Sequence, residues 1–435
     1  MFSNLLQKVD VLYKSVSFGD LFISLFPKLL AKRLKKIVHS QQKLVKQLAK
    51  KDKIKVAFFI QTPTTWKYDY LYRLFERYNI FDPIVVIVPF NVHLYYSKQE
   101  YINVMAQTEE FVKSSNYKYI SAYCASNHKW IDVKKEVNPD IVFFTKPYKD
   151  TLPKYHVYSF ANKLSCYVPY GFVCIDNYKN NYGSIFHSML WKSFVETPYQ
   201  KEYYNKYGIR SDENVVVSGC LGMEPIISPN YQPRNVWKPQ SKPKKRIIWA
   251  PHHTVDYLFN FSNFFTYCEL MLQLAEKYQD EIQIAFKPHP VLKFKLINIW
   301  GEEKTEEYYQ RWRNLPNGQL EDGAYIDLFA TSDAMIHDCA SFTAEYLYTQ
   351  KPTMFIVKDE HTTDHLNSFG EKCFALHYHA HSPADVERYV ADVVIAGNDA
   401  MKTQRVQFFE EYLCPTDGVM PSQKIIDIIL NEIKN

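Results

Sequence analysis

The stretch Ile282-Gln-Ile-Ala-Phe-Lys-Pro-His-Pro290 decides the fold of the C-terminal half of the chain. Its first five residues are mostly apolar, which predicts a short buried strand. Pro288 and Pro290 fix φ and remove two backbone donors, so we expect a stiff loop at the carboxyl end of this strand. A rigid His289 beside Lys287 suits a phosphate or a developing oxyanion, although a strand-end histidine can also simply cap a loop.

Comparable apolar runs recur along the chain and alternate with stretches of helical periodicity. In the N-terminal half, the predicted strands are residues 56–60, 84–88, 119–123, 141–145 and 165–168. In the C-terminal half they are residues 246–250, 282–286, 325–326, 334–336 and 353–357. The predicted helices are residues 68–78, 98–114, 264–277, 341–348 and 383–396. Such alternation is typical of parallel sheets buried on both faces, so the sequence predicts an α/β, doubly wound fold.

The size and composition predict two globular domains. The chain has 435 residues, of which 46% are hydrophobic, so it exceeds the size at which one core stops growing and does not resemble a disordered protein. We expect an N-terminal helical segment at 1–53, a Rossmann-like domain at 54–228, a linker at 229–245, a second Rossmann-like domain at 246–400, and final helices at 401–435 that cross back to the first domain. Two such domains facing a cleft bind ligands at the carboxyl ends of their strands.

Positive charge is concentrated near the N-terminus. Residues 28–55 hold eleven Lys and Arg and one acid, a net charge of +10, whereas the whole chain carries +5. Apolar residues recur between them at helical spacing, which predicts a basic amphipathic helix. Two interpretations are open: the helix lies on an anionic membrane surface, or it packs on the protein's own body. Upstream apolar residues would serve as further membrane anchors, namely Phe2, Leu5, Leu6, Phe22, Leu25 and Phe26.

Several partners and compartments are disfavoured. Residues 56–435 sum to −5, so we expect no nucleic-acid partner. The eight cysteines include no C-x-x-C pair, and no apolar run approaches the roughly 20 residues needed to span a bilayer, so we expect a cytoplasmic protein.

His361 and His365 have the spacing of a metal pair but lack the Glu of H-E-x-x-H. With His377, His379 and His381 they are interpreted as a nucleotide-edge loop or exposed histidines, and we expect no metal and no cofactor.

A second informative stretch is Ser332-Asp-Ala-Met-Ile-His-Asp-Cys-Ala-Ser-Phe-Thr-Ala-Glu345. It predicts a strand, a polar turn and a helix that begins at Ser341, a residue type favoured as an N-cap. The free backbone N–H groups of such a helix start make an anion site that would fit pyrophosphate. An ordinary capped helix after a strand is the simpler alternative.

Together, these motifs resemble the CDP-glycerol glycerophosphotransferase family, which polymerises teichoic acids and similar polyol-phosphate chains. The resemblance rests on Lys-Pro-His-Pro at 287–290, the Ser-Asp to Ala-Ser stretch at 332–341, and Glu345 followed by Lys351-Pro352, and it covers about residues 245–357. It implies a GT-B fold, a CDP donor bound mostly by the C-terminal domain, and attachment at the inner face of the plasma membrane. The N-terminal domain would then bind the acceptor.

The resemblance also implies roles for residues of the donor site. His289 corresponds to the family's catalytic or phosphate-binding histidine, and Ser341 and Thr343 would hold the pyrophosphate. Lys287 with His252 or His253 would neutralise charge; the histidine pair stands where the family usually offers Thr and a phosphate-binding Arg. Asp338 or Glu345 would bind the ribose or orient His289.

The first domain departs from the family pattern. The family presents a Trp-His-Gly-Thr segment whose histidine is a candidate general base, whereas the nearest counterpart here, residues 166–172, has the glycine and no histidine. Candidates for acceptor activation are therefore His187, Asp69 or His289 itself. Tyrosines near this region suit either sugar and polyol binding or packing, namely Tyr68, Tyr70, Tyr167, Tyr170, Tyr178 and Tyr182.

The function that we expect is transfer of a polyol phosphate, glycerol phosphate or ribitol phosphate, from a CDP-activated donor to a cell-surface polymer or lipid-linked acceptor. One alternative is a GT-B glycosyltransferase that uses a nucleotide sugar in capsule or lipopolysaccharide assembly. Another is a non-catalytic, membrane-associated assembly subunit.

Overall fold

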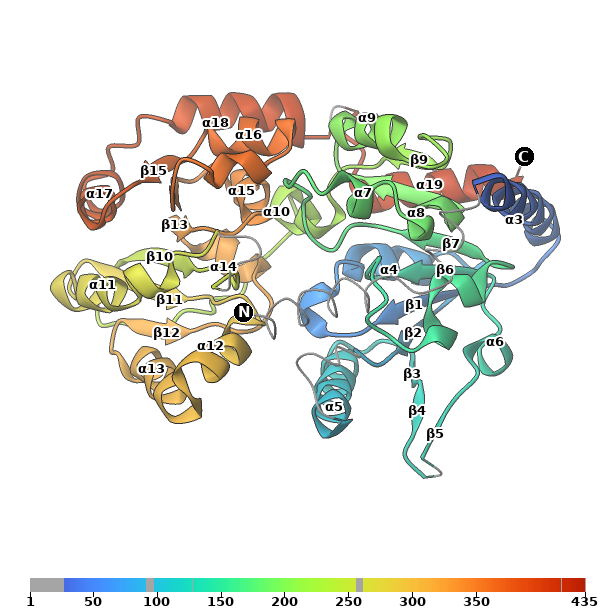
Figure 1. Cartoon of the computed structure of the whole chain (residues 1–435), viewed down its shortest axis with the longest axis horizontal. Helices are drawn as coiled ribbons and strands as arrows, with labels where there is room; N and C mark the ends of the chain where they lie inside the picture. The colour runs from blue at the N-terminus through green and yellow to red at the C-terminus, as the bar shows by residue number, and fades with distance from the viewer. Residues whose placement is uncertain (1–26, 91–97, 127, 256–260, 416, 435) are drawn as a thin grey trace, which may run out of the picture. The chain divides into compact units, whose positions relative to one another are not determined.

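The computed structural model describes residues 27–90, 98–126, 128–255, 261–415 and 417–434. The fold divides into two compact units (Figure 1). Unit 1 comprises the described residues up to Tyr170, Tyr178–Ser218 and the C-terminal residues from Ser422; unit 2 comprises Gly171–Asn177 and Gly219–Pro421. The segment Gly171–Asn177, inside the range expected for the first domain, thus belongs to unit 2.

Unit 1 is built on a seven-stranded sheet in the order β3-β2-β1-β6-β7-β8-β9, with every neighbouring pair parallel. Its strands are β1 (Ile54–Ile60), β2 (Phe81–Ile87), β3 (Tyr119–Ser121), β6 (Ile141–Phe144), β7 (Leu164–Tyr167), β8 (Lys192–Val195) and β9 (Val215–Val217). Strands β2 and β6 pair with opposite sides of β1. After β3 the chain therefore returns to β1 and adds its later strands on the other side. This topological switch point is where doubly wound sheets bind ligands.

The helices of unit 1 pack on an aromatic core. They include α4 (Asp69–Arg77), α5 (Lys98–Ser114), α6 (Val133–Glu136), α7 (Tyr178–Asn181), α8 (Ile185–Met189), α9 (Pro198–Tyr207) and α19 (Pro421–Lys434). At the centre, the rings of Phe58 and Phe143 stack with centroids 4.8 Å apart. The residues expected as one strand at 119–123 divide between β3 and β4 (Tyr123–Cys124), and β4 pairs antiparallel with β5 (Lys129–Trp130).

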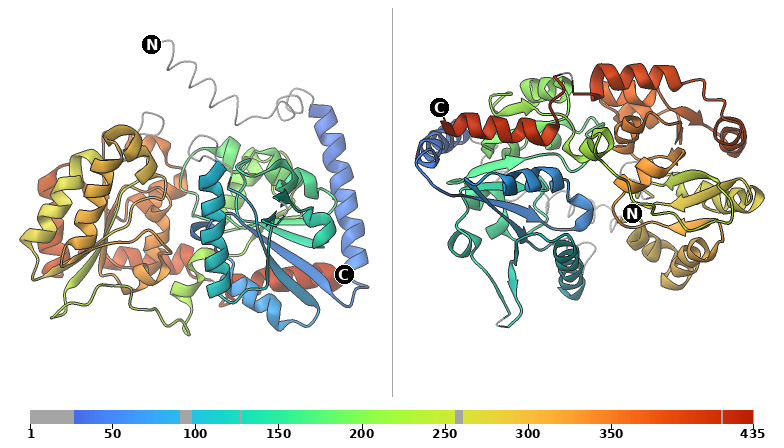
Figure 2. Two further views of the ribbon diagram at one scale, coloured as in Figure 1. Left: turned by 90° about the horizontal axis from the view of Figure 1, so that it is seen from below. Right: turned by 180° about the vertical axis from the view of Figure 1, so that it is seen from behind.

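The N-terminal helix α3 (Pro27–Leu48) uses its apolar face to complete the core of unit 1 (Figure 2). Leu30, Leu34 and Ile37 are buried in the cluster that contains strand residues such as Phe59, and the Gln41 amide donates to the Met189 carbonyl at 3.0 Å. Its Lys and Arg side chains are exposed. Packing on the protein's own body is therefore the interpretation that the structure supports for this face. The anchors expected at residues 2–26 lie outside the described residues.

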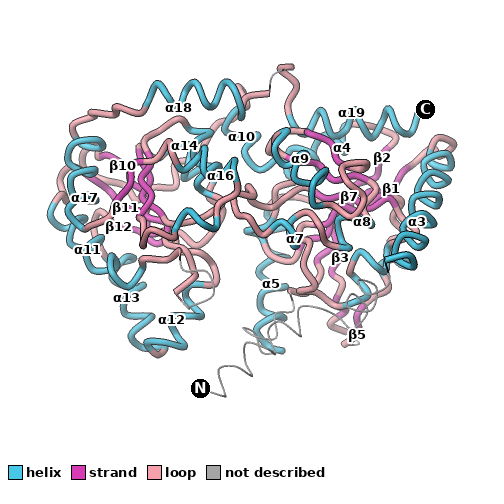
Figure 3. The backbone as a smooth tube through the Cα atoms, turned by 45° about the horizontal axis from the view of Figure 1, so that its top comes forward, coloured by secondary structure: helices cyan, strands magenta, loops and turns pink. Residues whose placement is uncertain are grey.

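Unit 2 is built on a six-stranded parallel sheet in the order β12-β11-β10-β13-β14-β15. Figure 3 shows β10, β11 and β12 of this sheet in magenta. The strands are β10 (Lys245–Ala250), β11 (Ile282–Phe286), β12 (Gly318–Leu320), β13 (Ala334–His337), β14 (Thr353–Ile356) and β15 (Tyr378–Ala380). The strand predicted at 325–326 is wrong: Tyr325 precedes helix α14 (Ile326–Thr331), whose buried Leu328 and Phe329 fit a helical turn.

Helices cover the sheet of unit 2, and consecutive residues of its inner strands are buried. They are α10 (Glu224–Ile227), α11 (Phe264–Lys277), α12 (Leu292–Trp300), α13 (Glu302–Asn314), α14, α15 (Phe342–Glu345), α16 (Ser368–Phe374), α17 (Pro383–Arg388) and α18 (Lys402–Phe408). On one face, Trp249 packs on Phe286 with ring centroids 4.9 Å apart and on Trp312 at 5.6 Å. The buried sheet holds the strand ends, and therefore the loops that follow them, in fixed register.

The two final helical stretches lie in different units. Residues 402–413 remain in unit 2, whereas α19 packs in unit 1, where Ile425, Ile426 and Ile429 are fully buried. Lys192 on β8 forms an ion pair with Glu432 of this helix. Among the described helices, none combines the length and apolar content needed to cross a bilayer.

Candidate functional site

Three neighbouring strands of unit 2 deliver the predicted donor-site residues to one edge of the sheet. His252 and His253 follow β10, Lys287 and His289 follow β11, and Asp338 follows β13. Register pairs Trp249 with Phe286 and Ala250 with His337, so the three loops begin side by side. The sheet thus brings together residues that the sequence separates by up to 86 positions.

The three histidines of these loops form one compact cluster, which we call the histidine cluster. The ring centroid of His253 lies 4.3 Å from that of His252 and 4.2 Å from that of His289, and the centroids of His252 and His289 are 5.5 Å apart. One ring nitrogen of each lies within 4.8 Å of the others. This spacing is compatible in principle with either a metal ion or an anion, and the protonation of the rings decides between them.

Hydrogen bonds fix the tautomers of two of these rings. The backbone N–H of Val291 donates to Nδ1 of His289 at 3.2 Å, so the proton of the neutral ring lies on Nε2. Nδ1 of His252 lies 3.0 Å from the Thr254 hydroxyl, which already accepts the N–H groups of Phe261 and Ser262. The hydroxyl hydrogen is therefore left to donate to His252, which again places the ring proton on Nε2.

The tautomers favour an anion over a metal. An Nε2–H group donates a hydrogen bond to an oxyanion, whereas a metal needs that nitrogen unprotonated. Burial, followed by the charges of neighbouring histidines and of Lys287 and Lys295, lowers the pKa of His289 well below its ordinary value of 6.5. The pKa of His252 is lowered in the same direction by burial, His253 and Lys295. The rings are thus neutral donors, and the positive charge of the site comes from two buried lysines.

Those two lysines are Lys287 and Lys295, which are only 4% and 8% exposed. Lys287 was predicted from its place beside the His-Pro motif. Lys295, on α12, was not, because its approach to the histidines depends on how the helix follows the loop. The signal that a sequence reader can use is its position in the first turn of the helix that follows the His-Pro loop.

Asp338 positions the loop that carries the histidine pair. Its carboxylate is buried and accepts the backbone N–H of His252 at 2.5 Å and that of Asn263 at 2.6 Å. Burial raises the pKa of Asp338 to about 7, against the effect of these hydrogen bonds. Since both oxygens hold the backbone of the loop after β10, the structure indicates a positioning role for Asp338.

The helix start after β13 is only partly available to a ligand. Thr343 is fully buried, and its hydroxyl donates to the Cys339 carbonyl at 3.0 Å. Glu345 is also buried; it accepts the N–H of Phe172 at 2.8 Å and the hydroxyl of Tyr325 at 2.6 Å. Both side chains therefore have hydrogen-bond partners within unit 2, and their donor-binding roles remain predictions. Ser341 is half-buried beside them and makes no side-chain cap to the four-residue α15.

The two candidate bases in unit 1 lie apart from each other and in different surroundings. His187 on α8 is buried against the rings of Tyr167, Phe186 and Tyr204, with Nδ1 2.8 Å from the Ser184 hydroxyl. Burial lowers the pKa of His187 to about 3. The ring of His187 therefore packs within the core of unit 1, and its catalytic role remains a prediction.

Asp69 lies in the first turn of α4, where it accepts the Tyr117 hydroxyl and lies 3.7 Å from Arg73. The Asp69 carboxylate therefore already has partners among the side chains of unit 1. Of the tyrosines considered for sugar or polyol binding, Tyr68, Tyr167 and Tyr182 are at most 4% exposed, which favours packing for them.

The C-terminal histidines also divide between surface and core. His361 is exposed, whereas His377 is buried and its Nδ1 lies 2.9 Å from the Cys373 carbonyl. Over the described ranges, no metal-compatible group of three ligands includes either residue.

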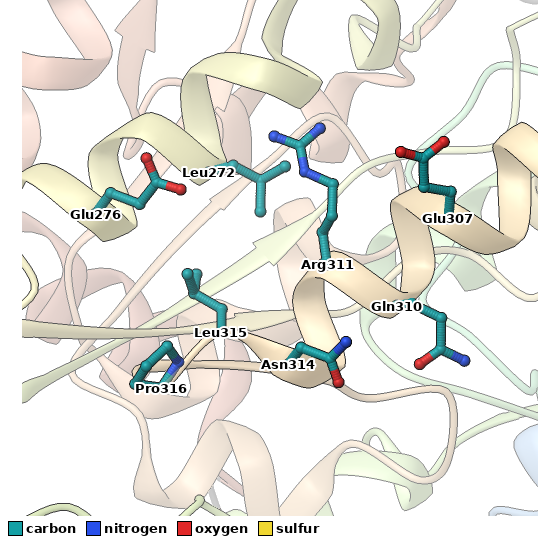
Figure 4. A pocket seen from close by; sticks show the side chains of 8 residues that line it. All are labelled: Leu272, Glu276, Glu307, Gln310, Arg311, Asn314, Leu315 and Pro316. Carbon is teal, nitrogen blue, oxygen red and sulfur yellow. The ribbon is translucent and has the colours of Figure 1, made fainter.

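A groove of about 400 Å³ lies between α11 and α13 (Figure 4). Its lining includes Leu272 and Glu276 near the end of α11, and Asn314, Leu315 and Pro316 near the end of α13. These helix ends lead into the starts of β11 and β12, so the groove lies at the amino edge of the sheet. Doubly wound sheets bind ligands at the opposite, carboxyl edge, where the histidine cluster lies.

Comparison with solved structures supports the fold. A variant of the wall teichoic acid polymerase TagF is 15% identical, with a TM-score of 0.55 over 96% of this chain and 98% of that chain. MnaA from S. aureus with UDP is 15% identical, with a TM-score of 0.54 over 88% of this chain and 98% of that chain. A UDP-N-acetylglucosamine 2-epimerase is 12% identical, with a TM-score of 0.52 over 88% and 95%. The predicted GT-B architecture is confirmed.

Comparison of sequences finds a family to which the C-terminal part of the chain is similar. No curated protein sequence matches the chain at a significant level. Residues 239–431 match the sequence model of CDP-glycerol:poly(glycerophosphate) glycerophosphotransferases, a range that contains the whole histidine cluster. This match confirms the resemblance drawn from the motifs at 287–290 and 332–341. Residues 239–431 are thus similar to the CDP-glycerol:poly(glycerophosphate) glycerophosphotransferase family.

Proposed function

We propose that the protein transfers a polyol phosphate, glycerol phosphate or ribitol phosphate, from a CDP-linked donor to a hydroxyl group of a cell-surface polymer or lipid-linked acceptor. The family match supports the reaction class. The observation that carries the proposal is the histidine cluster, in which His252 and His289 present Nε2–H groups beside buried Lys287 and Lys295.

This arrangement has the chemistry that a pyrophosphate needs. Phosphoryl transfer requires little covalent work from a protein and depends on positioning and on neutralising the charge of the phosphate oxygens. The lysines supply charge in a site of low dielectric, and the neutral rings supply directed donors. The acceptor hydroxyl would lose its proton to solvent as its oxygen bonds to the β-phosphorus, and CMP would leave with the electrons of the broken P–O bond.

A panel of donors tests the proposal. The purified protein is incubated with CDP-glycerol, CDP-ribitol and several nucleotide sugars, together with a synthetic glycerol phosphate oligomer. CMP release from a CDP-polyol, with growth of the oligomer, is the expected result. Turnover of nucleotide sugars alone would contradict the proposal and favour a glycosyltransferase, and no turnover of any donor would favour a non-catalytic subunit.

We also propose that the protein acts at the cytoplasmic face of the plasma membrane through the exposed basic side chains of α3. Because Leu30, Leu34 and Ile37 are buried in unit 1, the attraction would be electrostatic. Each basic residue near an anionic surface contributes about 1 kcal/mol. Lys32, Lys35 and Lys36 are exposed, and their replacement by Gln should weaken sedimentation with anionic vesicles. Binding that is unchanged by this triple substitution and by 0.5 M salt would contradict an electrostatic contact.

A further inference from the structure

The hydroxyl group of Thr254 ties together two parts of the loop after β10, the loop that carries His252. Thr254 is only 5% exposed. Its hydroxyl oxygen accepts the backbone N–H of Phe261 and that of Ser262, each at 3.2 Å. The hydroxyl therefore holds the first residues of this loop against the residues that lead into helix α11.

The residues that lead into α11 are themselves anchored to β14. The side-chain amide of Asn263 donates to the carbonyl of Ile356, the last residue of that strand, at 3.0 Å. The Lys358 ammonium group, two residues further along the chain, donates to the Ser262 carbonyl at 3.0 Å. Because β14 is a buried strand of the parallel sheet, the Thr254 hydroxyl rests on a rigid support.

The hydrogen atom of this hydroxyl is left for the ring of His252. A threonine hydroxyl donates one hydrogen bond and accepts two. The two backbone N–H groups use both acceptor sites, so the hydrogen is directed at Nδ1 of His252, 3.0 Å away. Thr254 then has no hydrogen-bonding capacity left for a ligand. It can affect a ligand only through the His252 ring.

This hydrogen bond determines which way the ring turns. Asp338 accepts the backbone N–H of His252, and that bond leaves the side-chain torsions free. The χ2 torsion of a histidine is broad and roughly two-fold, so a half turn would exchange Nε2 with a ring carbon at little cost. Among the described residues, Thr254 is the hydrogen-bond partner that distinguishes the two orientations of this ring.

We propose that Thr254 is a positioning residue of the donor site, whose hydroxyl turns the His252 ring so that Nε2–H, rather than a ring carbon, faces the bound pyrophosphate. This role rests on the proposed transferase function. It falls to a residue for which the sequence motifs predict no role.

Calorimetric titration with CDP-glycerol tests the effect of Thr254 on donor binding. Thr254→Val keeps the shape of the side chain and should weaken the Kd more than twofold and up to roughly 12-fold, the range for one neutral hydrogen bond. Thr254→Ser keeps the hydroxyl and should bind within twofold of the wild type. Thr266→Val is the matched control, since Thr266 is an exposed threonine of α11, and it should also bind within twofold.

A second background separates orientation of the ring from general support of the loop. In a His252→Ala protein, adding Thr254→Val should change the Kd less than twofold, because the hydroxyl has no ring to act on. An equal loss of affinity in both backgrounds would overturn the proposed role. A folded Thr254→Val protein that binds CDP-glycerol like the wild type would overturn it as well.

The tautomer of His252 is a readout that needs no ligand. Nitrogen NMR of wild-type protein labelled in its histidine rings, with the His252→Ala spectrum to assign the signal, should show the neutral ring protonated on Nε2. Protonation on Nδ1 would overturn the proposed role, even if Thr254→Val does not fold. Failure of the wild type to bind CDP-glycerol or CDP-ribitol would instead refute the proposed function, and the spectrum would still decide whether Thr254 orients the ring.

Discussion

The substitution His289→Asn separates the two roles of this histidine in the donor site. Nδ1 of His289 accepts the N–H of Val291, two residues ahead, at 3.2 Å. An asparagine Oδ1 accepts the same kind of bond in an Asx-turn, so the loop after β11 keeps its conformation. The substitution removes only Nε2–H, the group that we assign to a phosphate oxygen.

The size of the effect follows from the bond that is lost. A hydrogen bond to a charged group contributes about 1.5–3 kcal/mol, which corresponds to a roughly 10- to 150-fold weaker Kd for the CDP-linked donor. Isothermal titration of wild type and variant with CDP-glycerol measures this directly, and a melting curve shows whether the fold is kept. An unchanged melting temperature together with a Kd within twofold of wild type would refute the assignment of Nε2–H to the phosphate.

Three further predictions concern stability. Burial lowers the pKa of His337 to about 3, so the unfolded chain binds its proton more readily; stability is lost as pH falls from 6.5 toward 3, by about 1.4 kcal/mol per pH unit. Urea unfolding at several pH values should show that the unfolding free energy depends less steeply on pH in His337→Asn and as steeply as in the wild type in exposed His361→Gln. The same pH dependence in all three proteins would contradict this. Asp338→Asn turns an amide N–H₂ toward a backbone N–H, so it should lower the free energy of unfolding by about 1–3 kcal/mol and weaken donor binding. A variant with the melting temperature and the donor Kd of the wild type would exclude the positioning role. Ile426→Ala in α19 should cost about 2–5 kcal/mol in chemical denaturation, and a loss below 1 kcal/mol would show that α19 does not complete the core of unit 1.

The strands that the sequence predicts well are those buried on both faces. The run at 282–286 coincides with β11, because five consecutive buried residues leave little ambiguity. The edge strands β12 and β15 are three residues long and carry polar residues, so local pattern does not distinguish them from loops. The basic helix was predicted correctly as a helix, but only tertiary structure shows that its apolar face is already covered.

In the donor site, local motifs predict which residues gather but not what each one does. Lys287 and His289 follow the same buried strand, so their place at its end can be derived from sequence. Glu345 looks equally available in the sequence, yet its carboxylate accepts from Phe172, 173 positions away.

The most direct test of the central claim is the structure of the protein bound to CDP-glycerol. We predict that the pyrophosphate lies at the carboxyl edge of β10, β11 and β13, within hydrogen-bond distance of Nε2 of His252 and His289. Density for the nucleotide elsewhere, such as the groove between α11 and α13, with the histidine cluster empty, would contradict it.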